Sequence, residues 1–229
     1  MPNRVLVATL AAGLAVFGGV APATAAKKKP KLLPNCAAKK SKTIAQSAEG
    51  RIYSIGTNAY ACSFKANKRF FLGDTDECQN QSKVEDFRFG KGIVGYLDGS
   101  CGLVSGSESI VVRNLKTGKI VNSGSPVDHT FPGGESSTSI SSWGLKPNGS
   151  IAWIGTNSGF VTTQGGPPAP ATDLIQVWKR EAGTAGTKLD EGPDVVAGSL
   201  AVGAESDVNT GLSPVYWTKG TATFSSTLK

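Results

Sequence analysis

The chain has 229 residues, a formal net charge of +7 and four cysteines, and 39% of its residues are hydrophobic. This length is enough for one domain with a hydrophobic core. The cysteines lack CxxC spacing, and the sequence has no phosphate-binding glycine loop, dinucleotide fingerprint or zinc-protease motif. These absences exclude the most recognisable nucleotide-binding and zinc-dependent classes, so no cofactor, metal-binding or catalytic residue is assigned.

Residues 1–26 are predicted to be a signal peptide outside the fold. Arg4 supplies a short positive region, residues 5–21 are an apolar run, and residues 23–25 (Ala-Thr-Ala) form a small-residue cleavage pattern. We expect cleavage after residue 25 or 26. A retained membrane anchor is the weaker alternative, because glycine and proline interrupt the run, and no later stretch is apolar enough to span a bilayer. The sequence therefore predicts a secreted or envelope-associated protein.

Residues 27–42 are predicted to be a basic, largely disordered tail, since they contain seven lysines and no acidic residue. From residue 43 onward, 16 basic residues face 17 acidic ones, so the body at 43–229 is nearly neutral. The tail either serves solubility alone or attaches weakly to an anionic envelope polymer or lipid headgroups. Nucleic acid is not an expected partner, because the basic residues do not continue onto the body.

The four cysteines of an exported chain predict disulfides. Three connectivities are compatible with four cysteines. We favour Cys36–Cys62 and Cys78–Cys101, which link neighbours along the chain. The first bond would pin the basic tail to the body.

Short apolar runs with period-two alternation and frequent turn glycines predict an all-β fold. The segment RIYSIGTNA (51–59) returns as SIAWIGTNS (150–158), with five of nine positions identical, which indicates repeated units. Extending this match predicts equivalent strands at 52–56, 94–98, 151–155 and 215–219. Their alignment places four residues in one column: Ser54, Tyr96, Trp153 and Trp217.

Further strands flank these segments, and together they predict four units of three or four antiparallel strands at 43–81, 82–136, 137–194 and 195–229. The predicted preceding strands are 84–90, 139–146 and 197–203, and the predicted outer hairpins are 59–72, 110–121, 173–190 and 221–228. Gly118 is expected at positive φ in its hairpin turn. In the hairpin at 59–72, Asn67 aligns with Gly118 and is expected at positive φ too. Asparagine is the residue other than glycine that best tolerates this conformation.

The hairpin VRNLKTGKIV and the later GSIAWIG resemble the WD40-like and TolB-like repeats of exported bacterial β-propeller proteins. The resemblance covers most of residues 52–228 and implies radially packed sheets that bind a partner or ligand on one ring face. The Gly-His and Trp-Asp dipeptides of eukaryotic WD40 blades are absent. Four units are the lower limit for a ring. The ring closes if residues 31–42 pair with the last unit; otherwise the fold is an irregular sandwich or an open array.

The aromatic column is interpreted as packing between sheets, although exposed rings could also line a pocket for sugars or peptides. His129 beside Asp128 has no defined serine partner, so a solvent-exposed histidine is favoured over a catalytic triad. The loop at 73–79, with Asp74, Asp76 and Glu77, is interpreted as a polar turn rather than a calcium site. Residues 189–194 are read as an ordinary turn.

Three functional hypotheses follow. The first is an exported, disulfide-containing, propeller-like protein that binds a protein, peptide or envelope polymer. The alternative is an extracellular polysaccharide hydrolase or lyase, whose loop carboxylates would come from a set of four: Asp98, Glu108, Asp128 and Glu135. Such an enzyme needs two of these acids close together in a cleft. The third is a structural envelope component anchored by its lysine tail.

Overall fold

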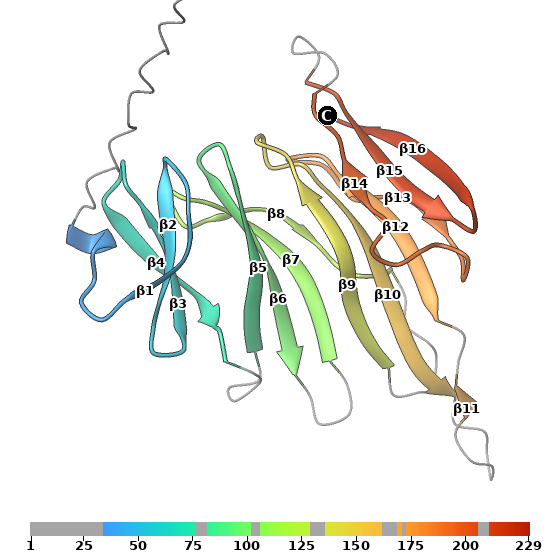
Figure 1. Cartoon of the computed structure of the whole chain (residues 1–229), viewed down its shortest axis with the longest axis horizontal. Helices are drawn as coiled ribbons and strands as arrows, with labels where there is room; N and C mark the ends of the chain where they lie inside the picture. Colours follow the sequence, from blue (N-terminus) through green and yellow to red (C-terminus); the bar gives the residue numbers. More distant parts are fainter. Residues whose placement is uncertain are drawn as a thin grey trace, which may run out of the picture. The chain divides into compact units, whose positions relative to one another are not determined.

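The structure, a computed structural model, describes residues 34–76, 82–101, 106–128, 136–161, 169–170, 173–205 and 211–229 (Figure 1). Glu77, Cys78, His129, Glu135 and the predicted signal peptide lie outside these residues. The predicted all-β class is confirmed, because apart from the 3₁₀ turn η1 (Pro34–Cys36) every named element is a strand. Within the described ranges, no helix is long and apolar enough to cross a membrane.

The strands fall into four groups that follow one another along the chain. Group 1 contains β1 (Lys42–Gln46), β2 (Gly50–Ile55), β3 (Asn58–Ser63) and β4 (Lys68–Asp74). Group 2 contains β5 (Ser82–Gly90), β6 (Ile93–Cys101), β7 (Gly106–Asn114) and β8 (Ile120–Gly124). Group 3 contains β9 (Ser136–Leu145), β10 (Ile151–Val161), β11 (Ala169–Pro170), β12 (Leu174–Arg180) and β13 (Thr187–Glu191). Group 4 contains β14 (Ala201–Val202), β15 (Ser213–Lys219) and β16 (Ala222–Leu228).

Neighbouring strands within each group pair antiparallel, as predicted, but groups 2 and 3 are not separate sheets. β7 and β9 form one parallel bridge between Ser107 and Thr138, which joins the two groups into a nine-stranded sheet. The predicted second strands of the units correspond to β2, β6, β10 and β15. Turn chemistry is also confirmed, because Gly118 has φ 73° and Asn67 has φ 48°.

Each pair of successive groups encloses a hydrophobic cluster. The cluster between groups 1 and 2 contains Ile52, Ala59, Ala61, Leu72, Val84, Val94, Tyr96, Val111 and Leu115. The cluster between groups 2 and 3 contains Ile93, Leu97, Ile110, Val112, Ile140, Trp143, Ile151 and Trp153. Ile154, Ile175, Val177, Val195 and Trp217 lie between groups 3 and 4. The second strands of groups 2 and 3 contribute to two clusters each, because successive side chains of a strand point to opposite faces.

The aromatic column is a packing device, but its first member is Tyr53 rather than the predicted Ser54. Tyr96, Trp153 and Trp217 each point toward the preceding group, and they are at most 5% exposed. In β2 the residue that points away from group 2 is Tyr53, which is fully buried. Aligning the sequences by identity shifted this strand by one residue, and such a shift exchanges the two faces of a strand.

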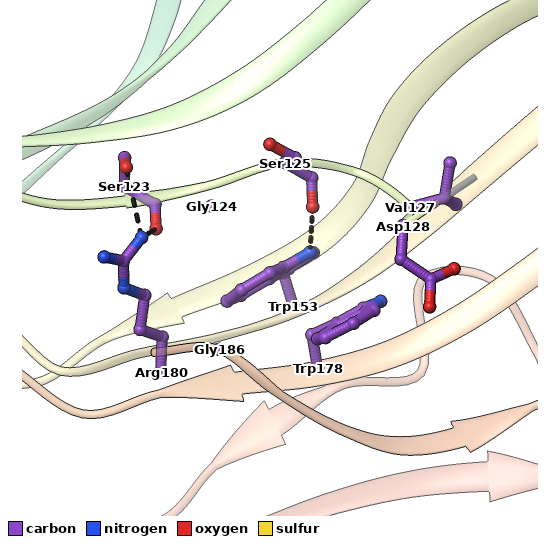
Figure 2. A pocket seen from close by; sticks show the side chains of 9 residues that line it. All are labelled: Ser123, Gly124, Ser125, Val127, Asp128, Trp153, Trp178, Arg180 and Gly186. Carbon is purple, nitrogen blue, oxygen red and sulfur yellow. Dashed lines mark hydrogen bonds between the residues drawn. The ribbon is translucent and has the colours of Figure 1, made fainter. Parts of the chain in front are cut away.

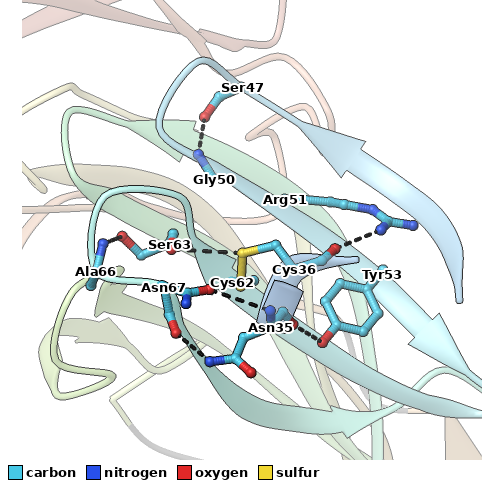
Figure 3. The surroundings of a disulfide bond; sticks show 10 residues. All are labelled: Asn35, Cys36, Ser47, Gly50, Arg51, Tyr53, Cys62, Ser63, Ala66 and Asn67. Carbon is cyan, nitrogen blue, oxygen red and sulfur yellow. Dashed lines mark hydrogen bonds between the residues drawn. A yellow bond between two sulfur atoms is a disulfide. The ribbon is translucent and has the colours of Figure 1, made fainter. Parts of the chain in front are cut away.

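The predicted disulfide Cys36–Cys62 is present, and it covers the outer face of group 1 (Figure 3). Cys36, Tyr53 and Cys62 are fully buried there in a cluster that Ala38 and Phe64 extend. The Arg51 guanidinium donates to the Cys36 carbonyl at 2.8 Å. The predicted Cys78–Cys101 bond lies outside the described residues.

Among the described residues, the first strand does not pair with the last group in the way that ring closure would require. Residue 42, expected to help close the ring, begins β1 and pairs with β2 of group 1. The predicted tail at 27–42 therefore enters the fold before residue 43. On the outer face of group 4, Tyr216 is 41% exposed. The two outermost faces thus end differently: one is covered by the disulfide-bonded segment, and the other presents Tyr216 to solvent.

Candidate functional site

A short last strand in group 2 creates the candidate site. β8 ends at Gly124, and the chain then crosses over β10 of group 3. A side chain at Gly155 would place its Cβ 1.7 Å from the Pro126 carbonyl oxygen, so only glycine permits this crossing. Figure 2 shows the segment 123–128 running above two tryptophan rings.

The space between this segment and group 3 is a pocket of about 350 Å³. It is lined by Ser123, Gly124, Ser125, Val127, Asp128, Trp153, Trp178, Arg180 and Gly186. The volume is at the lower end of the range typical of small-molecule sites, about 300–1,000 Å³. The pocket therefore suits a small ligand or the end of a chain-like one.

The floor of the pocket is a pair of tryptophans. Trp153 of β10 and Trp178 of β12 are cross-strand partners, and their rings stack at 6.0 Å between centroids with an angle of 9° between planes. The Trp153 indole donates to the Ser125 carbonyl at 2.8 Å, and the Trp178 indole donates to the Gln176 side chain at 3.0 Å. Both rings are thus held in fixed positions, with Trp178 half-buried rather than enclosed.

Charged side chains surround Asp128 on one side of the tryptophan pair. The Asp128 carboxylate accepts from Gln176 at 2.6 Å and from Lys188 at 3.0 Å. Lys188 also donates to Glu191 at 2.7 Å, and Gln176 to the same carboxylate at 2.7 Å. These hydrogen bonds, to Glu191 first and to Asp128 second, raise the pKa of Lys188 and keep it charged. Asp128 is consequently held in place beside the pocket by two hydrogen bonds.

The positively charged side chain of Arg180 also lines the pocket. The Arg180 guanidinium donates through Nη1 to the Ser123 carbonyl at 2.9 Å and through Nε to the Thr184 carbonyl at 2.7 Å. The pocket therefore combines the half-buried Trp178 ring, which is backed by the buried Trp153, with an oriented carboxylate and an oriented guanidinium. Such a combination is chemically suited to a ligand that has both C–H faces and hydroxyl groups.

The three described carboxylates of the alternative hypothesis (Asp98, Glu108 and Asp128) are not gathered in this pocket. Asp98 pairs with Ser109 and Glu108 pairs with Gly99, so the two acids point to opposite faces of the β6–β7 ladder. Burial raises the pKa of both. Of the three acids that the structure describes, only Asp128 lines the pocket.

Two other sequence candidates that the structure describes, Asp74 and Asp190, have structural roles. Asp74 is 4% exposed and accepts from Thr57 and from the Asp76 amide, as in a polar turn. Asp190, within the predicted 189–194 turn, belongs to β13 and accepts from Trp217 at 2.9 Å and Lys219 at 2.7 Å. Among the described side chains, no group of three or more His, Cys, Asp or Glu is arranged to hold a metal ion.

Sequence reasoning missed three residues of the site: Gln176, Trp178 and Arg180. A signal for them exists, because residues at i, i+2 and i+4 of a strand share one face. The alternation at 173–190 predicts an outer hairpin but does not by itself single out this polar and aromatic face. Trp153 and Asp128 were both considered, separately and for different reasons.

Comparison with known proteins finds similarity to solved structures alone. No protein-family model matches the chain, and no curated protein matches it. One solved structure, of MPT-4, a mannose phosphorylase from Leishmania mexicana in complex with phosphate, aligns over 82% of this chain with 12% identity and a TM-score of 0.32. The chain spans 63% of that protein's length. A TM-score this low shows neither a common fold nor a common activity.

Proposed function

We propose that the protein is an exported binding protein, with strand groups arranged as in an open propeller-like array, whose tryptophan pocket holds a neutral saccharide. The single observation that carries this proposal is the stacked Trp153–Trp178 pair beside Asp128 and Arg180. Indole rings pack against the C–H face of a sugar ring, while charged groups bond to its hydroxyls.

Binding is favoured over hydrolysis because of how the carboxylates are placed. Glycoside hydrolysis uses two acids on either side of the scissile bond. Among the described acids, Asp128 lines the pocket and Glu191 binds the same Gln176 side chain, and both are already engaged by the same lysine, Lys188. A carboxylate held in that way suits hydrogen bonding to hydroxyls better than proton transfer.

The propeller-like arrangement is proposed from the way the groups succeed one another. Each group is an antiparallel ladder, and in groups 2, 3 and 4 the aromatic residue of the second strand points toward the preceding group. Successive ladders packed face to face, with loops of unequal length, are the pattern of a propeller fragment. Binding would then take place in a loop-bordered space between two groups.

The test is titration of the protein with neutral trisaccharides (maltotriose, cellotriose, xylotriose and chitotriose), followed by calorimetry and tryptophan fluorescence. Trp178→Ala should weaken the binding of whichever sugar binds by about tenfold or more, by analogy with stacking worth about 1–3 kcal/mol per ring. Gly186→Leu should abolish it, because a Cβ there would lie 3.6 Å from the Trp178 ring and the remaining side chain would fill the pocket.

Phe224→Ala is the matched control, since Phe224 is an exposed ring, stacked on Trp217, that does not line the pocket. It should leave the affinity unchanged. If no trisaccharide binds the native protein, or if both pocket variants bind as the native protein does, the proposed function is wrong.

A further inference from the structure

A second surface of the protein carries unpaired positive charge. Five exposed lysines lie at the β3–β4, β5–β6 and β7–β8 turns of groups 1 and 2: Lys65, Lys68, Lys91, Lys116 and Lys119. We refer to these turns as the turn face. Within the described residues, none of the five forms an ion pair, whereas Lys83, Lys188 and Lys219 each bind a carboxylate.

Three of these lysines converge on one depression. Lys65, Lys91 and Lys116 line a pocket of about 390 Å³ whose other lining residues include Phe64 and Leu115. The acidic residue there is Glu49, and its carboxylate accepts a hydrogen bond from the Gly92 amide. Positive charge is therefore concentrated in a concave site with one carboxylate, which is already used by the backbone.

Hydrogen bonds between the turns hold the lysines at fixed spacing. The Phe64 amide donates to the Glu49 carbonyl at 3.0 Å, and the Leu115 amide donates to the Gly92 carbonyl at 2.9 Å. Asn114 shapes its own turn by accepting from the Lys116 and Thr117 amides at 2.9 and 3.0 Å. The turn face is thus organised before any ligand arrives, which lowers the entropy cost of binding.

We infer that the turn face binds an acidic polysaccharide bearing carboxylate or phosphate groups. The site is separate from the tryptophan pocket and does not depend on the proposed function of that pocket. Lysines that act as point charges suit a repeating anion. Nucleic acid fits less well, because base binding uses exposed aromatic platforms, and the ring that lines this pocket, Phe64, is half-buried.

The probes are polygalacturonate, inorganic polyphosphate and single-stranded DNA of matched length, each titrated at several salt concentrations. The first two probes separate carboxylate from phosphate recognition. Replacing Lys65, Lys91 and Lys116 together by glutamine should weaken binding to one of the first two probes at least tenfold at low salt. It should also flatten the dependence of log K on log salt, because fewer counterions are released.

The matched control replaces Lys39, Lys40 and Lys42 by glutamine, which removes the same charge from exposed residues of the segment leading into β1. This control should reduce affinity by less than threefold. Equal losses in the two triple variants would mean that net charge alone acts, and would overturn the inference. So would tightest binding to DNA, or no binding to either anionic polymer. Trisaccharide binding measured on the same variants should be unchanged, which separates this test from that of the tryptophan pocket.

Discussion

Groups 1 and 3 each contain a stacked pair of aromatic rings, but the first pair is part of a core and the second borders a pocket. Tyr53–Tyr60 and Trp153–Trp178 are both stacked cross-strand pairs, with centroids 5.7 and 6.0 Å apart. The disulfide-bonded segment closes over the first pair, and Tyr53 is fully buried. The segment 123–128 crosses the second pair but leaves a pocket. The comparison teaches that the covering segment, rather than the pair itself, decides between core and binding site.

The largest expected effect on stability comes from removing the disulfide bond that holds the segment over the Tyr53–Tyr60 pair. Cys36→Ala combined with Cys62→Ala should lower the free energy of unfolding by about 3 kcal/mol, because the bond closes a loop with a sequence separation of 26. Urea unfolding under non-reducing conditions measures it. The same variant should leave the tryptophan pocket intact; a change of that pocket's ligand affinity would show that the two pairs are coupled, contrary to this comparison.

A smaller effect on stability is expected at the β3–β4 turn, where Asn67 binds Asn35 of the disulfide-bonded segment. Asn67→Ala should cost about 1–2 kcal/mol, because alanine is strained at φ 48° and cannot accept from the Asn35 amide. Asn67→Gly separates the two causes, since glycine tolerates the backbone but lacks the side-chain acceptor. Chemical denaturation of both variants checks this. Equal losses in the two would assign the effect to the hydrogen bond alone.

The smallest effect concerns a third pair, Trp217–Phe224. Burial would raise the pKa of Asp190, but hydrogen bonds from Lys219 and Trp217 outweigh it and lower the pKa below its usual range. The ionised form therefore stabilises the folded state above the unfolded pKa, about 4, and this contribution is lost as pH falls through the folded pKa.

Asp190→Asn should therefore reduce stability at pH 7, by less than about 1 kcal/mol for such a partly exposed pair, and the difference from the native protein should vanish in acid. Unfolding at a series of pH values gives this difference directly. Asp98 and Glu108 have raised pKa values, so their contribution has the opposite sign, and both proteins share it. A difference that grows as pH falls would contradict the assignment.

The sequence was sufficient for features that depend on local chemistry. The strands, the Gly118 and Asn67 turns and the Cys36–Cys62 bond follow from alternation, from the conformations these residues tolerate and from cysteine spacing. The sequence repeat did not predict which face of β2 each residue of group 1 occupies. Ile-Gly-Thr-Asn forms a turn between β2 and β3 at 55–58 but lies within β10 at 154–157, so identical residues are not structurally equivalent. Tertiary contacts, rather than local sequence, decide between the two.

The candidate site was predictable only in parts, because it is assembled from three elements. The chemistry of Trp153 and Asp128 was visible, but their approach to Trp178 depends on where β8 ends and how the chain leaves it. The turn face was missed for a related reason. The overall balance of charge after residue 43 is nearly neutral, and only the fold shows that unpaired lysines gather at adjacent turns.

The crossing at Gly155 makes one position in the middle of a strand intolerant of every side chain. Gly56, its counterpart in the sequence repeat, faces open space but has φ 60°, which favours glycine or asparagine for backbone reasons alone. A complete mutational scan would therefore report a steric block at residue 155 and a backbone preference at residue 56, although a repeat alignment treats the two residues as one. A consensus design that averaged the copies and placed any other residue at 155 would force the segment 123–128 away from the tryptophans. It would remove the pocket while leaving most of the strands in place.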